Sequence, residues 1–276
     1  MVRYLVLLPL ALVLAACGGG GGGALSLDPV AAAATKTAKS GGEHMTFQVC
    51  VRLPGPGGSQ SFTMTGNGDF DAAKHVGRAS LRFSGLPQIG RRAEEILDGT
   101  VVYVRFPFLE GRLPSGKRWL KLDLAKQGRA MGIDFNSLMQ SSTSDPTQML
   151  RYLEAASTGV EKVGTETVAG ATTTHYSATV DFDKLAQARP SDKSSIRRLE
   201  QLTGVKYVPV DVWIDRDGYV RKVKESLTMY PIPQGPSTRM VMSFEFSAFG
   251  KRVSVTPPPA DEVLDATKLA QSGAGG

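Results

Sequence analysis

The stretch MVMSFEFSA, residues 240–248, alternates apolar and polar side chains. Met240, Met242, Phe244 and Phe246 occupy every second position, and a valine, two serines and a glutamate separate them from one another and from Ala248. Successive side chains of a β-strand point to opposite faces of its sheet. The period of two therefore predicts an antiparallel strand with one buried and one solvated face.

The same period recurs along the chain, at 62–65, 81–83, 120–124 and 210–214. Residues that favour tight turns separate many of these runs. The clearest turn signals are Asn67-Gly68, Asp98-Gly99, Gly170 and Asp217-Gly218. The pattern predicts about ten or eleven strands, joined mainly by hairpins.

Two longer segments interrupt the strands with a helical pattern. Asp145 can cap a helix that has Pro146 at its first position, and Met149, Leu150 and Leu153 then share one apolar stripe. A second stripe predicts a helix over 191–202, which ends before a glycine. Shorter helical turns are expected at 135–139 and 182–185. The order of elements predicts an α+β domain with helices inserted into an antiparallel sheet.

The N-terminus has the pattern of a signal peptide. An uncharged apolar run from Tyr4 to Ala16 is shorter than the roughly 20 residues that a spanning helix needs. It ends in LAAC at 14–17, which resembles the bacterial lipobox, whose cysteine accepts a diacylglyceryl group before cleavage. We expect residues 1–16 to be removed and Cys17 to anchor the protein on the outer face of the cytoplasmic membrane. The alternative is an ordinary secretory signal with a chance cysteine.

The remaining boundaries follow from composition. Six glycines at 18–23, four alanines at 31–34 and a polar stretch to residue 42 predict a flexible tether over 17–43. Three prolines at 257–259 close the last strand, and the polar segment 257–276 is expected to be a tail. The folded domain is therefore expected over 44–256.

Composition excludes several classes of function. The chain has 276 residues and a formal charge of +6 that is spread along it, which argues against a nucleic-acid partner. Two cysteines and three histidines leave little material for a disulfide scaffold or a metal centre. Nucleotide-binding, metalloprotease and nucleophile-elbow motifs are absent, so we expect no enzyme activity, cofactor or metal. With Cys17 acylated, Cys50 should be a free, half-buried thiol.

Several short features in order resemble one protein family. They are the lipobox and glycine tether, the Asp98-Gly99 hairpin before YVRFP (103–107), KRWLKLD (117–123), the helix that Asp145-Pro146 opens, VG (163–164) and TTHY (173–176), and DVWID (211–215) before Asp217-Gly218. Together they resemble the LppX/LprG type of actinobacterial lipoprotein, which shares the LolA-like half-barrel. The resemblance implies a strongly curved antiparallel sheet whose helices cover the concave face. It also implies an apolar cavity that carries acylated lipids or lipoglycans within the cell envelope.

Strand parity alone selects the candidate cavity residues, together with the stripe of the first predicted helix. Adaptable methionine side chains are frequent among them. The candidates are Phe47, Phe62, Met64, Phe83, Met149, Leu150, Leu153, Met240, Met242, Phe244 and Phe246. We expect a non-catalytic carrier or chaperone of acylated lipids that is monomeric and can work with an envelope transporter. The alternative is a surface lipoprotein with a filled core that acts as a protein-interaction or regulatory module.

Overall fold

The structure is a computed structural model that describes residues 28–55, 58–85, 92–137, 157–230 and 236–267. Its described residues form one sheet of twelve strands in the order β12-β6-β5-β4-β3-β2-β1-β11-β10-β9-β8-β7. The strands are β1 (Gly42–Gly55), β2 (Gly58–Asp71), β3 (Val76–Ser84), β4 (Arg92–Asp98), β5 (Val101–Arg105), β6 (Trp119–Asp123), β7 (Ser157–Val168), β8 (Ala171–Asp181), β9 (Tyr207–Asp215), β10 (Val220–Met229), β11 (Thr238–Lys251) and β12 (Val263–Asp265).

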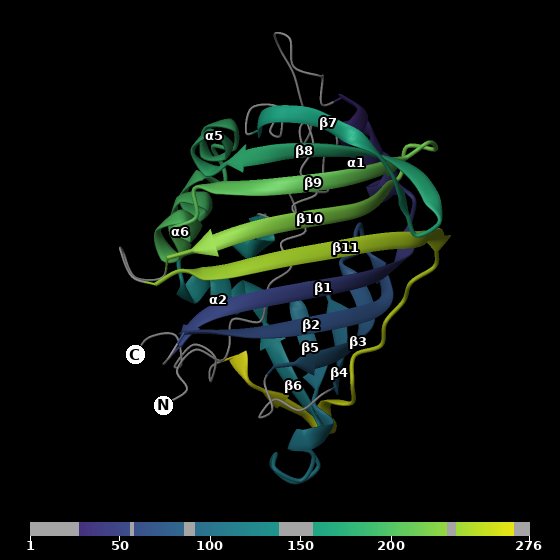
Figure 1. Cartoon of the computed structure of the whole chain (residues 1–276). Helices are drawn as coiled ribbons and strands as arrows, with labels where there is room; N and C mark the ends of the chain where they lie inside the picture. Colours follow the sequence, from purple (N-terminus) through teal and green to yellow (C-terminus); the bar gives the residue numbers. More distant parts are fainter. Residues whose placement is uncertain (1–27, 56–57, 86–91, 138–156, 231–235, 268–276) are drawn as a thin grey trace.

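The sheet is a single curved layer (Figure 1). Each strand pairs antiparallel with its neighbours except β12, which pairs parallel with β6. The predicted antiparallel α+β architecture is confirmed, but the described sheet has twelve strands and not ten or eleven. One of them, β12, lies in the segment expected to be a polar tail. A strand of three residues is too short to show a period, and its pairing with the edge of β6 depends on tertiary contact.

Three of the four turns predicted from glycine are found in the structure, and the turn predicted at Asn67-Gly68 is not. Gly99, Gly170 and Gly218 have positive φ angles and stand at turns, as predicted. Gly68 does not, because Asn67 and Gly68 lie inside β2 and pair with β1 and β3. A Cβ at Gly68 would come within 2.0 Å of the Arg78 carbonyl oxygen, so this glycine permits a close approach of two strands.

The α-helices that lie wholly within the described residues are α1 (Asp28–Lys39), α2 (Leu124–Ala130), α5 (Phe182–Ala188) and α6 (Lys193–Thr203). Residues 135–137 are helical as well, as expected for the turn at 135–139. The predicted helices at 182–185 and 191–202 correspond to α5 and α6, and Gly204 ends α6 in the left-handed conformation at φ 67°. The helix predicted from Asp145, with Met149, Leu150 and Leu153, lies outside the described residues. Helix α2 was not predicted.

Helix α1 corrects the expected tether. It occupies Asp28–Lys39, within the segment 17–43, and buries Val30 and Ala33 in the main core. Alanine favours helix formation, but this helix buries only small side chains, so the sequence shows no strong apolar stripe. The folded part of the chain therefore begins before residue 44.

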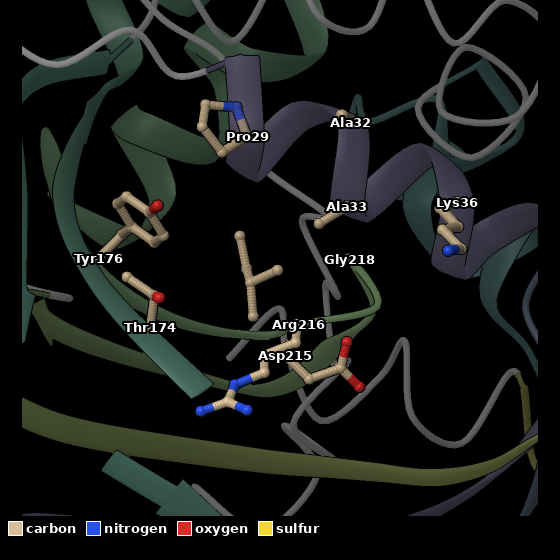
Figure 2. A pocket seen from close by; sticks show the side chains of 10 residues that line it. Pro29, Ala32, Ala33, Lys36, Thr174, Tyr176, Asp215, Arg216 and Gly218 are labelled. Atoms are coloured by element: carbon tan, nitrogen blue, oxygen red, sulfur yellow. The ribbon is translucent and has the colours of Figure 1, made fainter. Parts of the chain in front are cut away.

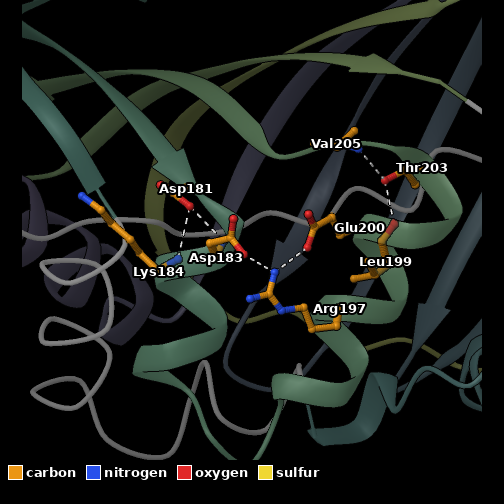
Figure 3. A network of polar contacts seen from close by, with 8 residues as sticks. All are labelled: Asp181, Asp183, Lys184, Arg197, Leu199, Glu200, Thr203 and Val205. Carbon is orange, nitrogen blue, oxygen red and sulfur yellow. Dashed lines mark hydrogen bonds and ion pairs between the residues drawn. The ribbon is translucent and has the colours of Figure 1, made fainter. Parts of the chain in front are cut away.

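Helices α5 and α6 form a corner at one end of β8, β9 and β10 (Figure 1). The Asp181 carboxylate caps α5 by accepting from the amides of Asp183 and Lys184. Arg197 of α6 joins the two helices through an ion pair with Asp183 of α5, and it also pairs with Glu200 of its own helix at 2.8 Å (Figure 3). These charged side chains pair with one another, and the apolar sides of both helices pack in the core.

The core lies on one face of the sheet, which we call the inner face. Apolar side chains of strands far apart in the order, such as Val104 of β5 and Val180 of β8, join one cluster there with Val30, Leu185 and Ile196 of the helices. Because α1, α5 and α6 contribute side chains to this cluster, these described helices pack against the inner face of the curved sheet.

Trp213 lies on the opposite, outer face but is buried. Its ring stacks on His175 at 4.2 Å between centroids, and the Lys222 ammonium lies 5.3 Å from the ring centre. Trp119 is buried as well. By alternation, Trp119 shares its strand face with Lys121, and Trp213 shares its face with Asp211. Neighbouring long side chains can cover a ring on such a face.

Candidate functional site: the inner face of the sheet

Strand register arranges the inner face in rows that run across the sheet. In one row, Phe47 of β1 stands between Gly66 of β2 and Phe244 of β11. In the next, Val49 stands between Met64 and Met242. A third row joins Phe62, Val51 and Met240. Eight of the predicted cavity residues therefore share one face of four adjacent strands; they are Phe47, Phe62, Met64, Phe83, Met240, Met242, Phe244 and Phe246.

These eight residues divide by burial. Met64, Met242, Phe244 and Phe246 are buried, and Phe244 is only 1% exposed. Phe47, Phe62, Phe83 and Met240 are half-buried although they pack against the same cluster. The inner face is therefore a packed core in part and an accessible apolar surface in part.

Glycine shapes this surface at Gly66. A Cβ there would come within 2.3 Å of the tip of the Phe47 ring, so the ring lies across the backbone of β2. Phe47 also contacts Phe244, with ring centroids 6.2 Å apart. A ring that lies along the sheet leaves space above it that an upright ring would fill.

Two glutamates interrupt the apolar rows. Glu225 of β10 stands between Val210 of β9 and Met242 of β11, and it is 2% exposed. Its Oε1 has no hydrogen-bond partner among the residues that the structure describes. Burial raises the pKa of Glu225 to about 8, so the carboxyl group is mostly protonated at neutral pH.

Glu95 is a second inner-face carboxyl group, on the other half of the sheet. It stands on β4 between Ala79 of β3 and Val104 of β5 and is half-buried. Burial raises its pKa to about 7. A third glutamate, Glu43 of β1, is buried opposite Phe70, and its pKa is raised to about 7 by burial and by the charge of Asp71.

A hollow of about 330 Å³ opens between α1 and the ends of β8 and β9 (Figure 2). Pro29, Ala32, Ala33 and Lys36 of α1 form one wall. The opposite wall consists of Thr174, Tyr176, Ile214, Asp215, Arg216 and Gly218. Thr174 and Tyr176 pair with Ile214 and Val212 in the sheet, so the hollow lies at the edge of the inner face.

Few contacts hold α1 in place over this hollow. The amide of Val220 donates to the Thr37 hydroxyl at 2.9 Å. The Lys36 ammonium lies 4.5 Å from the centre of the Tyr219 ring and donates to the Asp217 carbonyl. Val30 and Ala33 supply its buried apolar contact.

Two of the described histidines, His44 and His175, lie in ion-pair contacts with carboxylates. His44 binds Asp69 at 2.8 Å, and His175 bridges Glu166 and Asp211 on the outer face at 3.0 and 3.2 Å. Among the described residues, no group of three or more histidine, cysteine, aspartate or glutamate side chains is arranged so that it could hold a metal ion. Within the same ranges no helix has both the length and the apolar character needed to cross a bilayer.

The sequence missed three parts of this site: Glu95, Glu225 and the hollow under α1. Each glutamate has a signal in strand parity, because Glu95 lies between Ala93 and Leu97 and Glu225 between Val223 and Leu227 at alternate positions. Cys50 is a half-buried free thiol, which matches its prediction. Cys17 lies outside the described residues.

Two curated proteins of Streptomyces are similar in sequence. The chain is 31% identical over 165 residues to an uncharacterized 31.2 kDa protein of Streptomyces griseus, which covers 57% of this chain and 51% of that protein. It is 25% identical over 219 residues to a candidate lipoprotein of Streptomyces coelicolor, with 78% and 61% covered. The chain thus spans about half to three fifths of the length of these relatives.

No family model matches the chain. Among solved structures, the lipoprotein LppX of Mycobacterium tuberculosis aligns with a TM-score of 0.47 at 14% identity, over 83% of this chain and 96% of LppX.

Proposed function

We propose that this protein binds an acylated lipid against the inner face of its sheet and carries it within the cell envelope without covalent catalysis. The observation that supports this most directly is the half-exposure of Phe47, Phe62, Phe83 and Met240 on the face that also forms the core. Each Å² of apolar surface removed from water contributes about 25 cal/mol. An acyl chain laid on this surface would recover that free energy.

The proposed membrane attachment is the thioether of Cys17, on the outer face of the cytoplasmic membrane. Two or more acyl chains on that cysteine would hold the protein stably, because each buried CH₂ contributes about 0.8 kcal/mol. The hollow between α1 and β8–β9 is the proposed extension of the binding surface toward solvent. A monomer that delivers its lipid to an envelope transporter fits this arrangement.

The test is to purify the full chain from a bacterial host that acylates lipoproteins and to extract it for mass spectrometry. A lipid other than the anchor should be present in near-stoichiometric amount. Met240→Trp should reduce it, because the larger side chain fills space on the inner face. Val241→Trp is the matched control, since the neighbouring residue is also half-buried but faces outward. Absence of lipid from every preparation would support the protein-interaction alternative instead.

A further inference from the structure

Two carboxyl groups, those of Glu225 and Glu95, interrupt the apolar rows. Within the described part of the chain, neither Glu225 nor Glu95 forms an ion pair, and a buried carboxyl without a hydrogen bond costs free energy that an apolar residue would not. Their rows contain only apolar residues and glycine. For Glu225 these are Phe83, Met64, Val49, Met242, Val210 and Ala178.

We propose that Glu225 is the polar contact of the bound lipid and that its carboxyl group hydrogen-bonds a carbonyl or hydroxyl oxygen of an uncharged lipid. This inference rests on the proposed function. The unpartnered Oε1 lies on the inner face, in the same row as Met242 and one position from the half-exposed Met240 of the next strand. Glu95 provides a second such contact on the opposite half of the sheet.

The rows also indicate which lipids would be rejected. They hold acidic groups and no basic residue, so a carboxylate or phosphate headgroup at Glu225 would be buried without a counter-charge. An ester or alcohol has no charge and can accept the carboxyl proton. The geometry therefore favours uncharged ester or hydroxyl lipids over anionic ones at this position.

Burial, and no charged side chain among its described neighbours, sets the protonation state of Glu225. Its neighbours on β9, β11 and its own strand are Val210, Met242, Val223 and Leu227. On the nearby helices, Arg197 pairs with Asp183 and Glu200, and Arg189 pairs with Asp192 at 2.6 Å. Glu43 and Glu95 are the other inner-face acids and lose their protons first, near pH 7. Ionisation of Glu225 near pH 8 should then weaken its bond to the lipid.

The experiment measures displacement of the apolar fluorophore N-phenyl-1-naphthylamine from the full purified chain by dioleoylglycerol, oleate and hexadecane. Glu225→Leu should lower the affinity for dioleoylglycerol about tenfold, or about 1.4 kcal/mol. It should leave the affinity for hexadecane, which has no polar group, unchanged. Glu225→Gln keeps a donor and an acceptor, so it should stay within about threefold of wild type and lose the decline in affinity between pH 7 and 9. The control is Lys224→Leu, an exposed neighbour on the outer face.

Equal effects of Glu225→Leu on dioleoylglycerol and hexadecane, or no effect on either, would overturn the inference and leave lipid binding itself intact. Tighter binding of oleate than of dioleoylglycerol by wild type would overturn it too. If the fluorophore does not bind the wild-type protein at all, the proposed function fails first and this inference fails with it. Should Glu225→Leu not fold, the pH profile of Glu225→Gln decides, since an unchanged decline above pH 7 counts against the inference.

Discussion

Glu225 is a buried residue whose unpartnered carboxyl group is expected to lower the stability of the fold. Its carboxyl group stands between Val210 and Met242 with one unpartnered oxygen, where leucine would pack without penalty. The group avoids the larger cost of a buried charge by keeping its proton, which is why burial raises its pKa to about 8. Glu43 and Glu95 follow the same rule near pH 7.

The three acids predict how stability depends on pH. Each keeps its proton to a higher pH in the folded chain than its ordinary value of 4.5, so the folded state binds more protons between about pH 4.5 and 8. The free energy of unfolding should therefore be highest near pH 4.5 and fall as pH rises to about 8, by a few kcal/mol for Glu225 alone. Urea midpoints at pH 5, 7 and 9 measure this decline.

The double variant Glu95→Gln, Glu225→Gln should flatten that decline. Asp69, Asp123 and Asp265 have lowered pKa values and act only below about pH 4, so they do not enter this range. An identical slope in wild type and the double variant would contradict the assignment of the slope to these glutamates.

Truncation of the phenylalanines should separate packed core from accessible surface. Phe244 is 1% exposed, so Phe244→Ala should destabilise the fold by about 3 to 5 kcal/mol. Phe47 is half-buried, so its truncation removes fewer protein contacts, and Phe47→Ala should lower the free energy of unfolding clearly less than Phe244→Ala does. Chemical denaturation measures both, and lipid content should fall with Phe47→Ala. Equal costs for the two changes would indicate that the inner face is filled throughout.

At the scale of elements, α1 covers one end of the inner face through a small contact. Ala32 is exposed and lines the hollow, so Ala32→Trp should fill that hollow while changing stability by less than about 1 kcal/mol. Lipid retention should fall if the hollow extends the binding surface. Ala38→Trp is the control, because Ala38 is exposed on the same helix outside the hollow. Equal lipid retention in the two variants would show that the hollow beside α1 does not take part in lipid binding.

At the scale of the whole molecule, the lipobox predicts the location of the protein. Cys17→Ala should move the chain from the membrane fraction to a soluble or unprocessed pool, because the acceptor of the lipid is lost. Cell fractionation and immunoblotting measure this. A Cys17→Ala protein that is processed and still fractionates with membranes like wild type would show that another feature anchors it.

The sequence alone determined the local properties of the chain. A period of two placed the strand faces, and so predicted that Phe47, Phe62, Phe83 and Met240 share a side, because side-chain alternation is intrinsic to the backbone. An apolar stripe that ends before Gly204 likewise marked α6. These signals act within a few residues, so they can be read without the fold.

Only the tertiary structure decided features that depend on distant partners. Asn67-Gly68 has the composition of a turn but lies in β2, because β1 and β3 pair with it on both sides. The sequence predicts a tether and a tail where the structure has helix α1 and strand β12. The stability of α1 comes from packing on β9 and β10, and that of β12 from pairing with β6, so neither element has a strong sequence pattern of its own. Which apolar side chains become core and which stay accessible also depends on the curvature of the sheet. Curvature and register bring together strands far apart in sequence, and no local period encodes either one.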